Sequence, residues 1–160
     1  MTIEEFFEYI INKEKEKDKA LMKHIKATEN FHTITGVKYT DMPKAKGKVL
    51  GFDDLMANIE DSYNGYLEKK KQYLELYDFY LKYINKLNNQ TYRIIIENFY
   101  IHGERYKQLV NTLISFFRIE YSIDYVRQLK FKAKKEFEKL IDDAAIKEIE
   151  ELLATFDNEK

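Results

Sequence analysis

The amino-acid sequence predicts an all-α protein: a long N-terminal helical hairpin that resembles a coiled coil, then three shorter helices, then an acidic tail helix. Three observations predict this fold. Apolar residues recur at helical spacing along most of the chain. Only five Gly and one Pro interrupt 160 residues, and 34% of the residues are charged, which suits long solvated helices. We therefore expect three parts, residues 1–90, 91–140 and 141–160.

The strongest pattern lies in residues 53–88. Ten positions follow one another at alternating steps of three and four residues, and nine of the ten are apolar or aromatic. This heptad repeat predicts a long helix that packs against another helix or a second chain. The ten positions are Met56, Ile59, Tyr63, Tyr66, Lys70, Tyr73, Tyr77, Tyr80, Ile84 and Leu87. The expected dimer or partner interface consists of Tyr63, Tyr66, Tyr73, Tyr77, Tyr80 and Ile84.

The ends of the two long helices are also marked in the sequence. Thr2 and Glu5 have the spacing of a capping box, so we expect the first helix to run from about residue 2 to residue 30. Asp53 is the expected N-cap of the second helix, and residues 88–89 are its expected end. The intervening residues 33–52, with Pro43, predict a long loop.

An antiparallel fold of the two helices predicts their register. If residue 30 lies near residue 53, the acidic side chains of the charged run 13–19 lie level with residues 68–71. We expect those carboxylates to face Lys70, the one cation in the heptad repeat. The alternative interpretation of the charged run is a solvated helix face supported by Glu–Lys pairs.

Residues 91–140 predict three short helices. Apolar residues at helical spacing cover 92–100 and 106–117, and Gly103 is a natural stop for the first of these helices. Ser122 is a good N-cap for the third. The buried face expected on that third helix consists of Val126, Leu129, Ala133, Phe137 and Leu140. Residues 142–156 follow as an amphipathic helix that either continues the third helix or folds back.

Charge is segregated along the chain, although the net charge is only −1. Residues 104–140 contain nine Lys or Arg and five acids, a local charge of +4, whereas residues 141–160 contain two Lys and seven acids, a local charge of −5. Three helices with a basic, capped third helix predict a helix-turn-helix-like unit that binds the major groove of double-stranded DNA. The alternative is an ordinary solvated face of a helical bundle.

The expected DNA contacts lie on the exposed side of the third helix. Arg127 has the chemistry to read guanine and Gln128 to read adenine, whereas lysines bind phosphates without reading sequence. Asp124 is expected either to accept a hydrogen bond from cytosine or to favour the helix dipole. The DNA-binding candidates are Ser122, Tyr125, Arg127, Gln128, Lys130, Lys132, Lys134 and Lys135.

Three segments carry a resemblance to a known group of proteins: YTDMPKAKG at 39–47, YRIIIENFYIHG at 92–103 and YVRQLKFKA at 125–133. With the acidic-apolar helix 53–67, they resemble small regulators of phages and mobile elements. Those regulators carry a helix-turn-helix similar to sigma-70 region 4, with ArpU and RinA types among the relatives. The resemblance covers roughly residues 39–140 and implies a transcription regulator, whose N-terminal hairpin we expect to dimerise or to dock a partner. A two-fold dimer is expected to place two recognition helices on successive major-groove turns, about 34 Å apart.

The chain departs from that family between the second and third helices. Residues 111–121 are longer than the family's turn and contain no Gly. Either the second helix is longer or the turn is rebuilt, and the angle between the helices decides whether Arg127 reaches a base.

Other function classes have little support in the sequence. His24, His32 and His102 have no partner at catalytic spacing, and no phosphate-binding or metalloprotease motif occurs, so we expect no enzyme activity, cofactor or metal. No apolar run is long enough to cross a membrane, and we expect a cytoplasmic protein. The alternative function is a non-DNA-binding adaptor or antirepressor. It would contact a protein such as a repressor or RNA polymerase through the long helices or the acidic tail.

Overall fold

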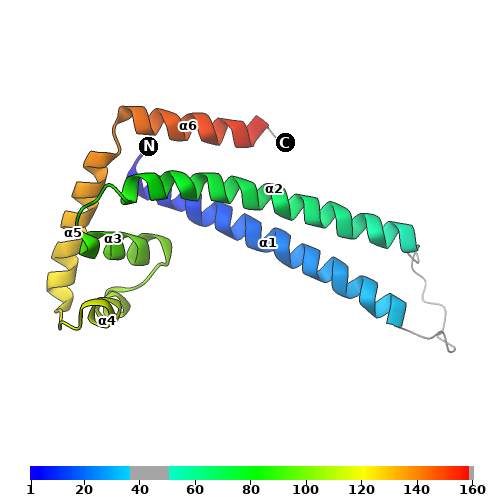
Figure 1. Cartoon of the computed structure of the whole chain (residues 1–160), viewed down its shortest axis with the longest axis horizontal. Coiled ribbons are helices and arrows are strands. Elements are labelled where there is room, and N and C mark those ends of the chain that lie inside the picture. The colour runs from blue at the N-terminus through cyan, green and yellow to red at the C-terminus, as the bar shows by residue number, and fades with distance from the viewer. Residues whose placement is uncertain (37–50, 159–160) are drawn as a thin grey trace. The chain divides into compact units, whose positions relative to one another are not determined.

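The computed structural model describes residues 1–36 and 51–158, and all regular secondary structure in those ranges is helical (Figure 1). This confirms the predicted all-α class. The helices are α1 (Ile3–Gly36), α2 (Phe52–Ile84), α3 (Gln90–Ile96), α4 (Tyr106–Phe117), α5 (Ile123–Leu140) and α6 (Asp143–Asn158), with a π-helical turn η1 (Glu97–Ile101) directly after α3. Helix α1 continues past the predicted end at residue 30 to Gly36, so the first residues of the predicted loop 33–52 are helical. The rest of that loop, with the DMP resemblance at 39–47, falls largely outside the described residues.

The chain divides into two compact units at boundaries that differ from the predicted ones. One unit is Met1–Asn12 with Leu74–Lys160, and the other is Lys13–Tyr73. We predicted a boundary near residue 90. The first turns of α1 belong instead with the C-terminal helices, because Phe7 stacks on Tyr100 and Phe137 at ring-centroid distances of 4.9 and 5.8 Å.

Within the unit 13–73, α1 and α2 run antiparallel and contact each other through polar groups. Lys13 Nζ donates to Gln72 Oε1 at 3.1 Å, and Lys69 Nζ lies 3.4 Å from Glu16 Oε2. His24 Nδ1 lies 3.0 Å from Ser62 Oγ. The predicted register therefore agrees with these contacts, but the cation that meets the carboxylate is Lys69 and not Lys70.

The face of α2 that packs on α1 is rotated from the predicted one. Leu55, Ser62 and Gln72 are buried, whereas Met56 and Tyr63 are 44% and 47% exposed. The apolar stripe on α2 is wide enough to offer two adjacent faces, so hydrophobic spacing alone does not choose between them. The polar partners on α1 select the face that carries Ser62, Lys69 and Gln72.

The helix ends confirm some predicted caps and correct others. Thr2 N–H donates to Glu5 Oε2 at 2.6 Å and Glu5 N–H donates to Thr2 Oγ1 at 3.2 Å, so the capping box is present. Helix α2 begins before Asp53, because the Asp54 carboxylate accepts a hydrogen bond from Gly51 N–H at 3.3 Å. It ends at Ile84, short of the predicted 88–89.

Helices α3, α4 and α5 pack on one another and contribute buried side chains to the core of the other unit, together with the start of α1, the end of α2 and α6. The predicted buried face of α5 is confirmed at Val126, Leu129, Ala133 and Phe137, which are at most 9% exposed, while Leu140 is half-buried. Gly103 follows η1 with a φ of 65°, a left-handed conformation that Gly adopts without steric penalty.

The connection from α4 to α5 shows both of the expected alternatives, a long second helix and a rebuilt turn. Helix α4 continues to Phe117, and its C-cap Arg118 has a φ of 54° and a ψ of 32°. The left-handed residue turns the chain, and Ser122 then begins α5 by accepting a hydrogen bond from Tyr125 N–H at 3.2 Å.

Helix α6 is separate from α5. Asp142 caps it by accepting a hydrogen bond from Ala145 N–H at 2.9 Å, and Ile149 and Phe156 are buried. Lys82 of α2 pairs with Glu148 of α6 at 3.0 Å. Among the described helices, none has the length and apolar character needed to cross a membrane.

Candidate nucleic-acid interface

Helix α5 presents most of the predicted DNA-binding residues at its surface. Its N-terminal turn is fixed by the Ser122 cap, and its buried face packs against α3 and α4. Six of the predicted residues are exposed: Ser122, Tyr125, Arg127, Gln128, Lys132 and Lys135. The other two, Lys130 and Lys134, are half-buried.

One row of cations on α5 is held by the protein's own side chains. Arg127 Nη1 donates to Asp124 Oδ1 at 3.2 Å, and its guanidinium lies 5.2 Å from the ring centre of Tyr106. Lys130 Nζ lies 4.6 Å from the ring centre of Phe99. Asp124 therefore orients Arg127, a role that the sequence did not indicate.

Lys134 has a structural partner in α1. Its ammonium group donates to the carboxylate of Glu4 and lies 3.5 Å from Glu138 Oε1. The hydrogen bond from Lys134 is the main influence that lowers the pKa of Glu4, and the same contact raises the pKa of Lys134. Lys134 was expected to bind phosphate, but in this structure it joins the start of α1 to α5.

A second row of lysines lines a groove on another side of α5. Lys132, Lys135 and Lys139 follow one another at helical spacing, and Lys86 comes from the turn after α2. The groove has a volume of about 480 Å³, and its one carboxylate, Glu136, pairs with Lys139 at 2.8 Å. The groove is therefore strongly cationic and suits a phosphate.

Two residues of this groove were missed by the sequence prediction. Lys139 continues the spacing of Lys132 and Lys135, so the helical period could have identified it. Lys86 lies 46 positions before Lys132 in the chain, and no local pattern joins the two.

Exposed apolar side chains gather in sequence around the α4–α5 connection. Phe116 is 61% exposed, Ile119 56% and Ile123 43%. Tyr121 and Tyr125 stack with ring centres 5.9 Å apart. Such a set of exposed apolar side chains is typical of a surface that contacts a protein.

The residues predicted for a partner interface on α2 divide into three groups. Tyr63 is exposed, and Tyr66, Tyr73 and Tyr77 are half-buried. Tyr80 and Ile84 are 1% and 4% exposed, so they belong to the internal core and are not available to a partner. Tyr80 is buried because its ring packs edge-on against Phe7 and Phe137.

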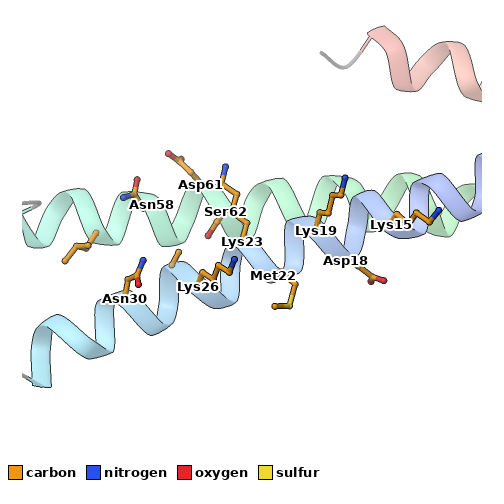
Figure 2. Close-up of a pocket in the computed structure, with 12 residues that line it drawn as sticks. Lys15, Asp18, Lys19, Met22, Lys23, Lys26, Asn30, Asn58, Asp61 and Ser62 are labelled. Atoms are coloured by element: carbon orange, nitrogen blue, oxygen red, sulfur yellow. The ribbon is translucent and has the colours of Figure 1, made fainter.

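The unit 13–73 contains a groove of about 980 Å³ between α1 and α2 (Figure 2). Lys15, Lys19 and Lys23 extend from α1 along it, and Asp61 and Ser62 lie on the α2 side. The lining mixes cations, carboxylates and amides without converging on one point. No group of three or more His or acidic side chains suited to a metal ion occurs in the described ranges.

No family model, curated protein or solved structure matches this chain. The resemblance to phage regulators therefore depends on the quoted sequence segments alone. A functional proposal has to be argued from the chemistry of α5 and its surroundings.

Proposed function

We propose that this protein is a DNA-binding transcription regulator encoded by a phage or mobile element, and that it reads double-stranded DNA with α5. One observation carries the proposal. Helix α5 buries its apolar face and leaves Arg127, Gln128 and Lys132 exposed on its other sides. An exposed helix with a guanidinium, an amide and several ammonium groups has the donors that base edges and phosphates accept.

In the proposed complex, α4 and α5 act as a helix-turn-helix and α1 with α2 forms a helical hairpin. The N-terminal half of α5 enters the major groove, where Arg127 binds guanine and Gln128 binds adenine. To do so, Arg127 breaks its ion pair with Asp124 and forms hydrogen bonds with the base. This exchange is feasible because exposed ion pairs contribute at most about 1 kcal/mol.

The cationic groove supplies the phosphate contacts of this complex. Lys132 and Lys135 line it and form no ion pair with a described residue. Their positive charges are therefore available to neutralise phosphates and release counterions. Lys134 contributes little, because Glu4 and Glu138 already neutralise it.

The proposal is tested by fluorescence anisotropy with a labelled pool of random-sequence 30-bp duplexes, titrated at several salt concentrations. We expect affinity to fall steeply with salt, and Lys132→Ala with Lys135→Ala to reduce the slope of log K against log salt by about 1.8. Selection from the same pool should yield a preferred sequence that Arg127→Ala no longer favours.

Lys147→Ala is the matched control, because Lys147 is an exposed lysine on α6, outside the groove. It should leave the salt slope unchanged. Absence of binding at low salt, or an equal loss in the control, would contradict the proposal.

The second candidate is an adaptor or antirepressor that acts by protein contact without DNA. The exposed Phe116, Ile119 and Ile123 favour this function. It predicts no DNA binding at low salt. It also predicts that Phe116→Ser with Ile119→Ser abolishes binding to a repressor or RNA polymerase. Under the first proposal, these substitutions affect DNA binding only by changing the connection between α4 and α5.

A further inference from the structure

Helix α2 carries a stripe of six residues whose spacing, and whose order of apolar and charged side chains, are the same from either end. From residue 56 to residue 74 the steps are four, three, four, three and four, so the stripe is symmetric about the point midway between residues 63 and 67. Two apolar residues lie at the centre, an acid and a base flank them, and an apolar residue stands at each end. The stripe consists of Met56, Glu60, Tyr63, Leu67, Lys70 and Leu74.

The apolar members of this stripe are exposed although the helix has a buried face elsewhere. Met56, Tyr63, Leu67 and Leu74 are 41–47% exposed. The hydrogen-bonded contacts with α1 use the adjacent face of α2, where Ser62 is buried, and of the four apolar side chains Tyr63 also touches α1, with its ring centre 5.3 Å from that of His24. The four side chains therefore form an apolar face that the described part of the chain leaves largely open to solvent.

The charged members of the stripe are also exposed. Neither Glu60 nor Lys70 forms an ion pair with another described residue, and Lys70 Nζ lies 5.9 Å from the ring centre of Tyr66. A groove of about 540 Å³ beside the stripe is lined by Met56, Glu60 and Tyr63 of α2 and by His24 of α1. The surface therefore offers apolar area, one charge of each sign and a depression.

We infer that this stripe binds the same stripe of a second copy of this chain, with the two α2 helices antiparallel across a two-fold axis. In that arrangement each stripe residue faces a residue of the second copy, and the two residue numbers add up to 130. Tyr63 then faces Leu67 of the second copy, and Met56 faces Leu74. The two-fold axis makes each contact occur twice.

Charge selects the antiparallel direction. In the antiparallel pair Glu60 faces Lys70 of the second copy, and the symmetry-related contact pairs Lys70 with Glu60. In a parallel, in-register pair Glu60 would face Glu60 and Lys70 would face Lys70. Like charges at such positions oppose pairing, whereas opposite charges fix direction and register.

The size of the stripe predicts a reversible dimer. Nineteen residues of helix, 56–74, extend about 28 Å. A single helix pair of this length buries less surface than a standard protein interface, so we expect a dimer that dissociates on dilution. Dimerisation through this stripe does not depend on DNA binding, because the stripe lies on α2 and the dimer can be measured with the protein alone.

The test is sedimentation equilibrium of the full chain over a range of concentrations at low salt. The wild-type mass should rise from 19.3 kDa towards twice that value. Glu60→Lys and Lys70→Glu should each weaken association by about tenfold or more, because each places like charges together twice. The double variant E60K/K70E should restore it, since the pairs are re-formed with exchanged partners.

Glu68→Lys is the matched control, because Glu68 is exposed on α2 outside the stripe and the charge change is the same. It should not alter association, and circular dichroism should show each variant folded. A wild-type chain that stays at 19.3 kDa would overturn the inference. So would single variants that associate like wild type, which is the result expected of a parallel pair. A double variant that stays as weak as the singles would also overturn it, because residues 60 and 70 would then not face each other.

Discussion

At the scale of single residues, the hydroxyl of Tyr80 is the least satisfied group in the core. It is buried and has no hydrogen-bond partner among the described residues. Burial, with Glu97 as a smaller influence, raises the pKa of Tyr80 well above its ordinary value. The ring itself packs against Phe7 and Phe137. The ring therefore stabilises the fold, and the hydroxyl opposes it.

We expect Tyr80→Phe to keep or increase the free energy of unfolding, by up to about 2 kcal/mol, because it removes an unpaired buried hydroxyl. Tyr80→Ala should decrease it by about 3–5 kcal/mol, because it leaves a cavity. Urea denaturation of the three proteins measures both changes. A loss of more than about 1 kcal/mol in Tyr80→Phe would indicate that the hydroxyl has a partner.

Asp124 forms the ion pair that Arg127 has to give up before its guanidinium can bind a base. Its carboxylate accepts the hydrogen bond from the Arg127 guanidinium and adds negative charge to the face proposed to meet DNA. Asp124→Asn should therefore increase affinity for duplex DNA by about two- to fivefold at low salt. Anisotropy measures the change, and Asp143→Asn on α6 is the control for a lost negative charge. Decreased affinity would mean that Asp124 itself contacts a base.

At the scale of elements, the turn between α4 and α5 is held by a residue in an unfavourable conformation. Arg118 has a positive φ, which costs an L-residue with a side chain about 1–2 kcal/mol. We expect Arg118→Gly to raise the free energy of unfolding by up to about 1 kcal/mol, because Gly adopts a positive φ without strain. The gain is limited because Gly loses more backbone entropy on folding than Arg does. Thermal unfolding measures the difference.

Lys107→Gly is the contrasting control, because Lys107 is exposed within α4 and a Gly there should destabilise by about 1 kcal/mol. If Arg118→Gly destabilised the protein to the same degree, the Arg118 side chain would have to make contacts that outweigh its backbone conformation.

Element positions were predictable where one local signal decides them. The Thr2–Glu5 capping box, the Ser122 cap and the buried face of α5 follow from spacing alone, and each is present. The rotation of α2 was not predictable from hydrophobic spacing, because the face that packs on α1 carries the polar residues Ser62, Lys69 and Gln72. Its outcome depends on Lys13, which lies far from Gln72 in the sequence.

At the scale of the whole molecule, the two compact units divide the chain at other positions than the predicted residue 90. Phe6 contacts Phe79 edge-on at 5.7 Å, and Phe7 stacks on Phe137. These contacts join the first turns of α1 to the end of α2 and to α5. Apolar residues near the start of a chain indicate a buried face, but they do not indicate which distant helix covers it.

The ion pair between Glu4 and Lys134 makes this long-range packing depend on pH. Lys134 lowers the pKa of Glu4 from 4.5, so the pair stabilises the folded state at neutral pH and is lost as pH falls through that lowered pKa. Glu4→Gln should therefore be less stable than wild type at pH 7, and the difference should shrink as pH falls below 4.5. Urea denaturation at several pH values measures it.

Glu8→Gln is the control, because Glu8 is exposed on the same helix. It should lose less stability at pH 7 than Glu4→Gln. A Glu4→Gln deficit that stayed constant into the acid range would mean that the side chain stabilises the fold by packing and not by charge.

The stacking of Phe7 on Phe137 has a consequence for how the protein is made. Roughly 130 residues separate the two rings in the chain, so a ribosome needs roughly 7 to 26 seconds between them. Throughout that time Phe7 lacks one of the rings that finally shield it, although its partners Tyr80 and Tyr100 are made earlier. The packing of the first turns of α1 is therefore expected to be completed late, after translation has passed α5.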